Sequence, residues 1–184
     1  AVEALRGAGS ASAAKGDWKE ASGFFNEAKL AMVAYRMPDP NALAGYIRTA
    51  SYLYKTQDKI AAHIETLKKT PDDLDARSNL VVTLVTVMDD PGEAMKYVNG
   101  DVDEKFRMFV PMAVKDLSEQ PVEACRNLGD WYYKELSKSD VSVVKSRMLT
   151  RAKDCYDRAL KLHTGADVTS AVLKLNLSQI KSDQ

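Results

Sequence analysis

Two histidines are the side chains best suited to general-base or metal-binding chemistry in this sequence. His63 lies in the segment KIAAHIETL, and no Cys, Asp or second His lies one helical turn away from it. A metal site or an activated base normally needs such a neighbour, so we expect His63 to be structural. His163 precedes Thr164 and Gly165, where a cation commonly lies near the free carbonyl groups of a helix end. We therefore interpret His163 as a helix-capping residue.

Neither the cysteines nor the aspartate cluster has the spacing of a metal site. Cys125 and Cys155 are far apart and lack the clustered pairs of a zinc site or a disulfide scaffold, so we expect small, packed apolar residues. Asp72, Asp73 and Asp75 lack the glycine turn and the distal glutamate of a calcium loop. Helix capping is the expected role of this cluster, and no metal or cofactor is assigned.

The chain lacks the short motifs of common enzyme classes. It contains no nucleophile elbow, phosphate-binding glycine loop, dinucleotide fingerprint or HExxH. The sequence therefore predicts a protein that is not an enzyme, with no catalytic residue. A constellation assembled from distant positions stays open as an alternative, because sequence spacing does not reveal it.

Composition argues against nucleic-acid binding and membrane insertion. The 184 residues include 26 Lys and Arg and 26 Asp and Glu, so no net positive field would attract a polyanion. The longest apolar candidate, NLVVTLVTVM, is shorter than the roughly 18 residues that a membrane span needs. A chain of this size can bury a sizeable core, and we expect a single domain over residues 1–184.

Apolar residues recur at helical spacing along almost the whole chain, which predicts an all-α fold. Helix starts are expected where a capping residue precedes proline or an acidic first turn, as at Asp17, Asp39, Thr70, Asp90 and Gln120. Within 99–119 the boundaries are open, because Pro111 either kinks a helix or begins a new one. The expected ranges are 1–15, 17–36, 40–56, 58–69, 72–88, 91–98, 103–116, 121–138, 140–163 and 166–181.

The tripeptide GDW occurs twice, with a different expected role each time. At the first, Gly16 breaks a helix, Asp17 caps the next one and Trp18 opens it. The flanking pattern is a small pair, a turn and then A-x3-F-x2-A, carried by Ala8, Gly9, Ser12, Ala21, Phe25 and Ala28. This pattern resembles the tetratricopeptide repeat, a two-helix unit in which small residues let the helices approach and an aromatic fills the gap.

The second GDW lies within the first helix of another such unit. Leu128, Gly129 and Tyr132 match the L-G-x2-Y of the repeat, so Gly129 is expected inside a helix against a close neighbour. Ala152, Tyr156 and Ala159 match its second helix, but the separation is longer than usual by about three helical turns. We expect a long terminal hairpin and a capping helix, whose apolar residues are Val168, Ala171, Val172, Leu175 and Ile180.

The resemblance implies antiparallel helical hairpins stacked as a short right-handed superhelix, a tetratricopeptide-like solenoid. Residues 1–36 would form the first hairpin, 40–116 degenerate hairpins, and 121–184 the long terminal hairpin with its cap. The C-terminal part is also similar to a helical segment of multidomain, often exported, proteins of planctomycete-type bacteria. Gly129, Trp131, Tyr132, Arg151, Ala152, Tyr156, Ala159 and Leu160 carry that likeness, which implies a module of a larger protein.

In tetratricopeptide-type units the ligand groove is lined by exposed positions of each first helix. The resemblance places these positions on Glu123, Arg126, Asp130, Tyr133 and Lys134 of the C-terminal unit, and on Glu3, Arg6 and Ser10 of the first. Separately, the spacing of Arg147, Arg151 and Arg158 predicts a strip for an acidic partner, with Asp154 and Asp157 set to pair with Arg158 and Lys161. An ordinary solvated face remains the alternative for both sets.

The leading hypothesis is a non-enzymatic protein–protein interaction or scaffolding module that presents a helical groove to a peptide or a neighbouring domain. A structural spacer or docking element within a larger chain is the alternative, and other domains of the same chain would then be its partners. A small-molecule-binding or hydrolytic helical domain is the third. The sequence does not reveal the compartment.

Overall fold

The computed structural model describes residues 1–183 and contains helices, turns and loops but no strand over that range. The all-α prediction is confirmed. The short elements are the 3₁₀ turns Pro40–Leu43, Leu117–Glu119 and Leu136–Lys138 and the π-helical turn Leu84–Met88. The α-helices are α1 (Val2–Ala14), α2 (Trp18–Ala34), α3 (Ala44–Lys69), α4 (Leu74–Thr83), α5 (Pro91–Met95), α6 (Glu104–Val114), α7 (Val122–Lys134), α8 (Ser142–Leu162) and α9 (Val168–Asp183).

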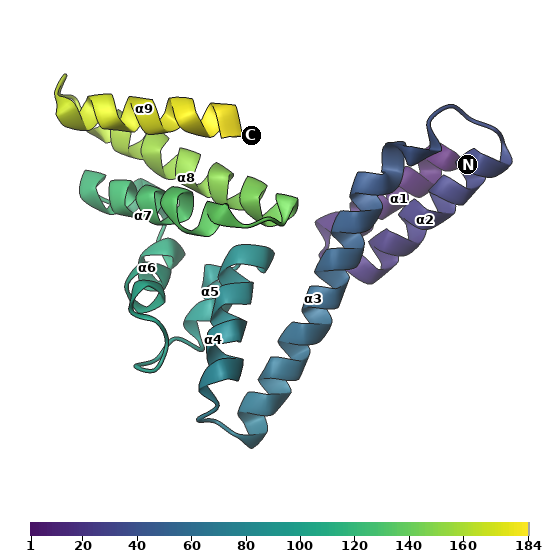
Figure 1. Ribbon diagram of the computed structural model, residues 1–184, viewed down its shortest axis with the longest axis horizontal. Helices are drawn as coiled ribbons and strands as arrows, with labels where there is room; N and C mark the ends of the chain where they lie inside the picture. Colours follow the sequence, from purple (N-terminus) through teal and green to yellow (C-terminus); the bar gives the residue numbers. More distant parts are fainter. Residues whose placement is uncertain (184) are drawn as a thin grey trace. The chain divides into compact units, whose positions relative to one another are not determined.

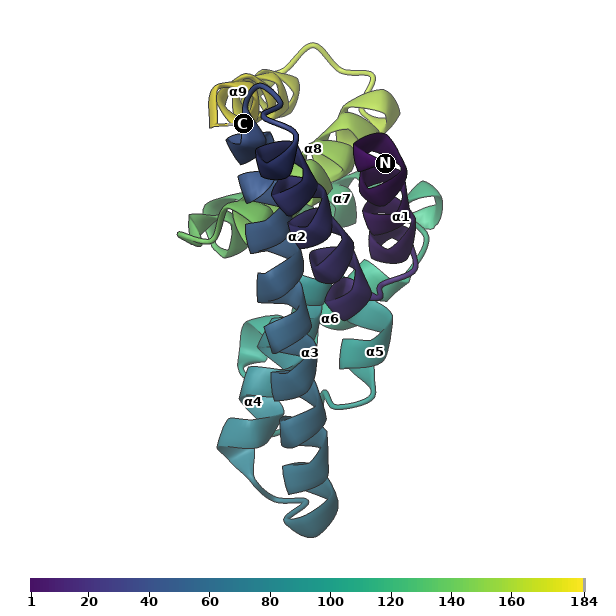
Figure 2. The same ribbon diagram turned by 90° about the vertical axis from the view of Figure 1, so that its right-hand side faces the viewer.

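The chain forms two compact units, residues 1–62 and 63–184, and α3 runs from the first into the second. In the first unit α1 and α2 form an antiparallel hairpin, which Figure 2 shows side by side. Gly16 makes the turn between them with a positive φ of 79°. Glycine adopts this conformation without steric cost. The arrangement of the hairpins into a solenoid stays a prediction.

Gly9 brings the two helices of the first hairpin close together. A Cβ atom added there would lie 2.7 Å from Cε1 of Phe25, so the ring occupies the space beside the glycine. Phe25 also packs with Ala21 and Ala50 in a buried cluster, and Val2, Ala28, Met32 and Leu43 form a second cluster of the same unit. The expected packing of a small residue against an aromatic is confirmed for this hairpin.

The same arrangement recurs in the second unit, where α7 packs along α8 (Figure 1). A Cβ atom at Gly129 would lie 2.7 Å from the Tyr156 ring, which confirms the expected close approach inside α7. Trp131 is fully buried on the α6 side, with its ring centroid 5.0 Å from Phe109 and 5.4 Å from Phe106. Helix α9 packs against α8.

Several helix starts fall where the capping residues predict them. Asp73 and Asp90 accept hydrogen bonds from the backbone N–H groups of Ala76 and Glu93, both at 2.8 Å. These bonds begin α4 and α5. Asp17 caps α2 through the N–H of Glu20 at 3.4 Å. Glu20 does not return a bond to the start of the helix, because its carboxylate accepts from Ser12 Oγ at 2.6 Å.

One expected division between helices is wrong, and one boundary that the sequence leaves open is settled by the structure. The predicted helices 40–56 and 58–69 are wrong in their division, since α3 is continuous over Ala44–Lys69. No glycine or proline interrupts the chain near Asp58, and Thr56 donates its hydroxyl to the carbonyl of Tyr52 one turn back. The segment around Pro111, whose boundaries the sequence leaves open, is one helix, α6, with the proline inside it.

The apolar face expected for the last helix is wrong for four of its five residues. Val168, Ala171, Val172 and Leu175 are exposed, and only Ile180 of that set is buried. The buried residues of α9 are instead Ser170, Leu173, Asn176 and Ile180. The buried face of α9 is therefore a mixture of polar and apolar residues. Val168, Val172 and Leu175 form an apolar stripe that is exposed to solvent.

Over residues 1–183, no helix is both long enough and apolar enough to cross a membrane.

Candidate functional site

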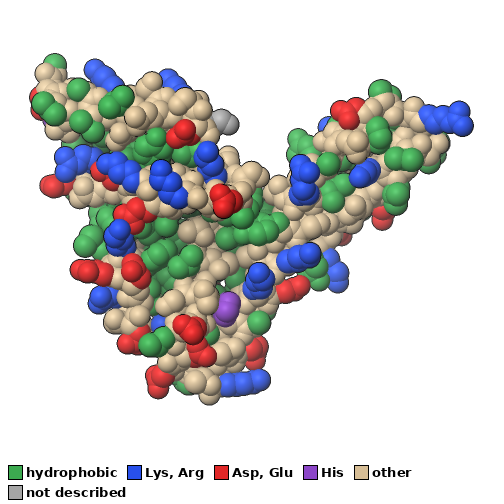
Figure 3. Space-filling view, in the orientation of Figure 1, with side chains coloured by type: hydrophobic (Ala, Val, Ile, Leu, Met, Phe, Trp, Pro, Cys, Tyr) green, Lys and Arg blue, Asp and Glu red, His purple; other side chains and the backbone are tan. Residues whose placement is uncertain are grey.

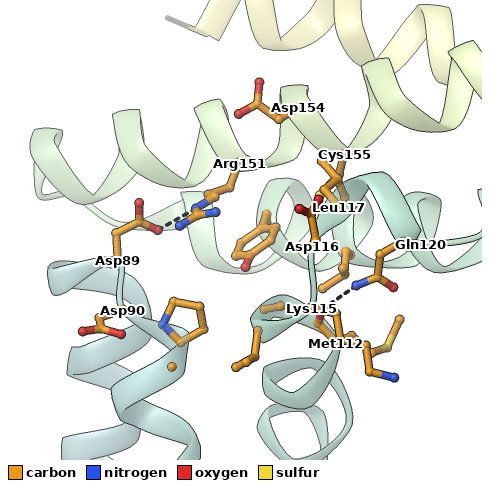
Figure 4. Close-up of a pocket in the computed structure, with 16 residues that line it drawn as sticks. Asp89, Asp90, Met112, Lys115, Asp116, Leu117, Gln120, Arg151, Asp154 and Cys155 are labelled. Carbon is orange, nitrogen blue, oxygen red and sulfur yellow. Dashed lines mark hydrogen bonds and ion pairs between the residues drawn. The ribbon is translucent and has the colours of Figure 1, made fainter.

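The second unit contains a pocket of about 560 Å³ between α5, the segment after α6, and the α7–α8 hairpin (Figure 4). It is partly open to solvent, and both polar and apolar side chains line it. The lining residues are Asp89, Asp90, Pro91, Gly92, Met112, Ala113, Val114, Lys115, Asp116, Leu117, Gln120, Leu128, Tyr132, Arg151, Asp154 and Cys155.

One side of the pocket is fixed by a strained turn between the π-helical segment and α5. Asp89 has a φ of 58°, in the left-handed region that non-glycine residues rarely occupy. Its carboxylate accepts from Arg151 Nε at 2.8 Å, which holds the turn against α8 (Figure 4). Arg147 donates to the carbonyl of Val87 in the same segment. Asp90 follows as the cap of α5, and its carboxylate accepts from the Glu93 N–H at 2.8 Å.

The opposite side is the segment between α6 and α7. Asp116 caps the 3₁₀ turn by accepting from the Ser118 N–H at 2.7 Å, and this bond lowers the pKa of Asp116. The buried Gln120 side chain donates to the carbonyl of Met112 at 2.5 Å, closing the loop on itself (Figure 4). Arg158 donates to the carbonyl of Ser118 and so fastens this segment to α8.

Tyr132 contributes an aromatic ring and a hydroxyl to the pocket lining. The residue is only 3% exposed, and its hydroxyl makes no hydrogen bond with any part of residues 1–183. Burial raises the pKa of the Tyr132 hydroxyl, Arg151 opposes this shift, and Cys155 and Asp89 add to it. The hydroxyl therefore lies near these three pocket residues and stays protonated at neutral pH.

Cys155 is a packed thiol rather than a nucleophile. Burial raises its pKa to about 12, and Cys125 and Asp154 act in the same direction. Because the thiolate is the reactive form, almost none is present at neutral pH. Cys125 is also buried, and desolvation raises its pKa. The structural role expected for both cysteines is consistent with this burial.

The groove residues expected on α7 lie on one face of that helix, outside the pocket lining. Asp130 accepts from Tyr156 Oη at 2.6 Å and pairs with Lys134 Nζ at 3.0 Å. Tyr133 donates its hydroxyl to Asp183 of α9 at 3.1 Å. Glu123 and Arg126 form only a long pair of 3.9 Å at the surface. Asp130 and Tyr133 are thus engaged in contacts with other helices of the second unit.

The three arginines of the expected acidic-partner strip all bond to their own chain. Arg147 and Arg158 donate to the carbonyls of Val87 and Ser118, and Arg151 pairs with Asp89. The expected pair between Asp157 and Lys161 is wrong, because Asp157 pairs with Lys153 at 2.7 Å. The strip stays a prediction. Each of its arginines already uses at least one N–H donor within the chain.

In the first unit, Glu3, Arg6 and Ser10 line a shallow hollow of about 250 Å³ together with Phe25 and Tyr46. The Arg6 guanidinium pairs with Glu3 at 2.9 Å in an exposed position. Such surface pairs contribute little stability, so both side chains remain available to a partner.

Neither histidine belongs to a cluster of potential metal ligands within residues 1–183. No group of three or more His, Cys, Asp or Glu residues within 1–183 could hold a metal ion. His163 is the residue that follows α8, but its Nε2 lies 2.8 Å from an oxygen of Asp167 and not against a helix carbonyl, so the expected side-chain cap is not formed. His63 lies within α3 and is half-buried.

No family model, curated protein or solved structure matches the chain.

Sequence reasoning misses the pocket because its residues have other expected roles. The sequence predicts Asp90 as a helix cap and Tyr132 as a packing aromatic, and both expectations are correct as far as they go. Only the tertiary fold brings Asp89 next to Arg151, 62 positions later in the chain. One local signal is the pair Asp89-Asp90 before Pro91. A helix start needs only one capping aspartate, so the second one indicates another role.

Proposed function

We propose that the chain is a non-enzymatic protein–protein interaction or scaffolding module built from helical hairpins. The observation that carries this proposal is the apolar stripe on the outer face of α9. Val168, Val172 and Leu175 are 79%, 42% and 56% exposed, and Figure 3 shows hydrophobic side chains at the surface of this helix. Their spacing of four and three residues places them on one helical face.

Such a stripe favours association because exposed apolar surface is unfavourable in water. Burying it contributes roughly 25 cal/mol per Å² of apolar area removed from solvent. The helix has a second, inward face that already packs on α8 through Leu173 and Ile180. The outer stripe is therefore not needed for the internal contact, and contiguous exposed patches of this kind commonly mark interaction surfaces.

The first unit has an exposed apolar set of its own. Leu30, Val33 and Tyr35 are exposed at the end of α2, and Tyr46 is exposed in α3. Each unit thus offers apolar surface independently of the other. This favours a scaffolding role, in which one chain contacts more than one protein segment.

A triple serine variant tests the proposal. Val168→Ser, Val172→Ser and Leu175→Ser together remove the stripe, while Lys174→Ser, Gln179→Ser and Lys181→Ser change the same number of exposed α9 positions without touching it. We expect pull-down from the source lysate to lose its specific partner with the stripe variant and keep it with the control. Circular dichroism should give equal helicity for both.

The predicted α7 groove is tested separately by Arg126→Glu. Tyr133 is unsuitable for this purpose because its hydroxyl bonds to Asp183, so its loss would also disturb α9. Arg126 has only the long pair with Glu123, and its replacement should leave the fold intact. Capture of the same partners by wild type, the stripe variant and Arg126→Glu alike would contradict the proposed surfaces.

A further inference from the structure

The first unit has an exposed apolar patch on α2, formed by Leu30, Val33 and Ala34. Leu30 and Val33 are 69% and 57% exposed, and Ala34 is exposed beside them. Val33 and Ala34 follow Leu30 by three and four residues, so the three side chains share one face of the helix. The buried residues of α2, among them Ala28 and Met32, lie at other positions. This α2 patch is therefore not part of the core of its unit.

The α9 stripe of the second unit has the same pattern. Val168 is followed after three, four and seven residues by Ala171, Val172 and Leu175, and all four are exposed. Both surfaces are uncharged, and both include an alanine among larger side chains. A small residue leaves a hollow between the ridges of a helix surface, and a Val or Leu of a facing helix can fill it. The two surfaces are thus complementary in shape as well as in polarity.

The net charges of the two units favour contact between unlike units. Residues 1–62 contain eight Lys and Arg against six Asp and Glu, and residues 63–184 contain 18 against 20. The first unit therefore carries a net charge of +2 and the second a net charge of −2. Two first units repel each other, and so do two second units, whereas a first unit attracts a second unit.

The small size of each surface favours a partner that carries both of them. Each surface spans about two helical turns or less. Three or four side chains bury less than the roughly 1,200 Å² that a specific, stable interface removes from solvent. Pairing either surface with itself would give one such small contact and leave the other surface exposed. Pairing one with the other gives each copy two contacts.

We propose that copies of this chain associate head to tail, with the α2 patch of one copy packed against the α9 stripe of the next. This inference rests on the proposed function, because it takes the α9 stripe as an interaction surface and names a second copy of the chain as its partner. A contact between two different surfaces either closes into a ring or extends as a chain of copies.

Sedimentation equilibrium of two variants, alone and mixed, tests this pairing. Leu30→Gln with Val33→Gln removes the α2 patch and keeps a good helix former at both positions. The triple serine variant described above removes the α9 stripe. Each variant retains only one of the two surfaces, so we expect each alone to be monomeric where the wild type self-associates. The mixture should form a complex of one copy of each variant and nothing larger, because only one pair of intact surfaces is present.

A nuclear magnetic resonance titration locates the contact and detects it even when it is weak. Unlabelled α2 patch variant is added to the ¹⁵N-labelled α9 stripe variant, and we expect saturable shifts of the backbone amides of Leu30, Val33 and Ala34. Met95→Gln with Met108→Gln is the matched control, since these side chains are 41% and 54% exposed and lie outside both surfaces. The control should self-associate as the wild type does. Circular dichroism should show the same helicity in every variant.

Each outcome decides the proposal. A complex that forms only when the two variants are mixed supports it. Self-association of the α2 patch variant alone would show that α9 pairs with itself, and self-association of the α9 stripe variant alone would show the same for α2. Either result, or a mixture that stays monomeric and gives no shifts, overturns it.

The same variants distinguish failure of this inference from failure of the proposed function. A monomeric chain whose capture of a lysate protein still depends on the α9 stripe would keep the proposed function and overturn head-to-tail association. A head-to-tail complex whose α9 stripe variant loses no lysate protein would do the reverse.

Discussion

At the residue scale, a glycine that faces an aromatic ring lets the two helices of each hairpin pack closely. Gly9 faces Phe25 in the first unit, and Gly129 faces Tyr156 in the second, each with 2.7 Å between a would-be Cβ and the ring. Real Cβ atoms do not approach that closely, so any side chain would push the ring or the helix away. Each glycine is therefore required by packing and not by its backbone dihedral angles.

We expect Gly9→Ala and Gly129→Ala each to lower the free energy of unfolding by about 1–3 kcal/mol, since both overpack a close helix contact. Gly23→Ala is the matched control, because nothing lies within 4 Å of its would-be Cβ. That variant should raise stability by roughly 0.5–1 kcal/mol through helix propensity. Urea titration followed by circular dichroism measures all three, and equal effects would contradict the packing argument.

Arg36 offers a stabilising substitution at the end of α2. Its φ is 51°, and the following N–H of Met37 bonds to the carbonyl of Met32 at 2.9 Å. Such a helix termination favours glycine. Arg36→Gly should therefore raise the melting temperature, with a gain of about 1 kcal/mol. Arg48→Gly, inside α3, should instead cost about 1 kcal/mol. A loss of stability in both variants would show that the left-handed conformation carries no strain.

At the element scale, side-chain caps decide where helices begin. Asp73→Ala removes the bond to the Ala76 N–H and should cost about 1 kcal/mol, whereas Asp73→Asn keeps an acceptor and should be nearly neutral. Asp72→Ala serves as the control, because the neighbouring Asp72 is not the cap of α4. Thermal unfolding distinguishes the three. Equal losses at Asp72 and Asp73 would indicate a general charge effect in place of a cap.

Local features of the sequence predict local features of the structure. The turn at Gly16, the caps at Asp73 and Asp90, and the helical glycine Gly129 each depend on a few neighbouring residues, and each is confirmed. The continuity of α3 is missed because Asp58 can serve either as a cap or as a helical residue. Only packing distinguishes those two roles.

The orientation of α9 and the pocket depend on contacts that sequence does not contain. Apolar periodicity places Val172 and Leu175 inside, but Asn176 and Ser170 face inward in the folded chain. Asn176 lies close enough to the Tyr156 hydroxyl to affect its pKa, so the polar residues of α9 meet polar groups of the α7–α8 hairpin. Hydrophobic periodicity alone therefore predicts the wrong buried face for a helix that packs on a polar surface.

At the scale of the whole molecule, the two units have unequal cores. The largest fully buried side chains include Trp131, Tyr156, Met148 and Leu149 in residues 63–184, whereas residues 1–62 contribute only Leu43 and Leu53 to that group. The first unit is also the shorter of the two, and a shorter chain buries a smaller fraction of its surface. The first unit should therefore open at lower free energy than the second.

Native-state hydrogen exchange with mass spectrometry tests this inequality. We expect peptides from α1 and α2 to exchange at least about tenfold faster than peptides from α7 and α8 in the absence of denaturant. The buried Cys125 and Cys155 give an independent probe of the second unit, because both thiols should resist labelling until it opens. Their labelling rate should rise with urea in parallel with the exchange of α7 and α8 and later than that of α2. One shared transition for all four helices and both thiols would show instead that the continuous α3 couples the two units into a single folding unit.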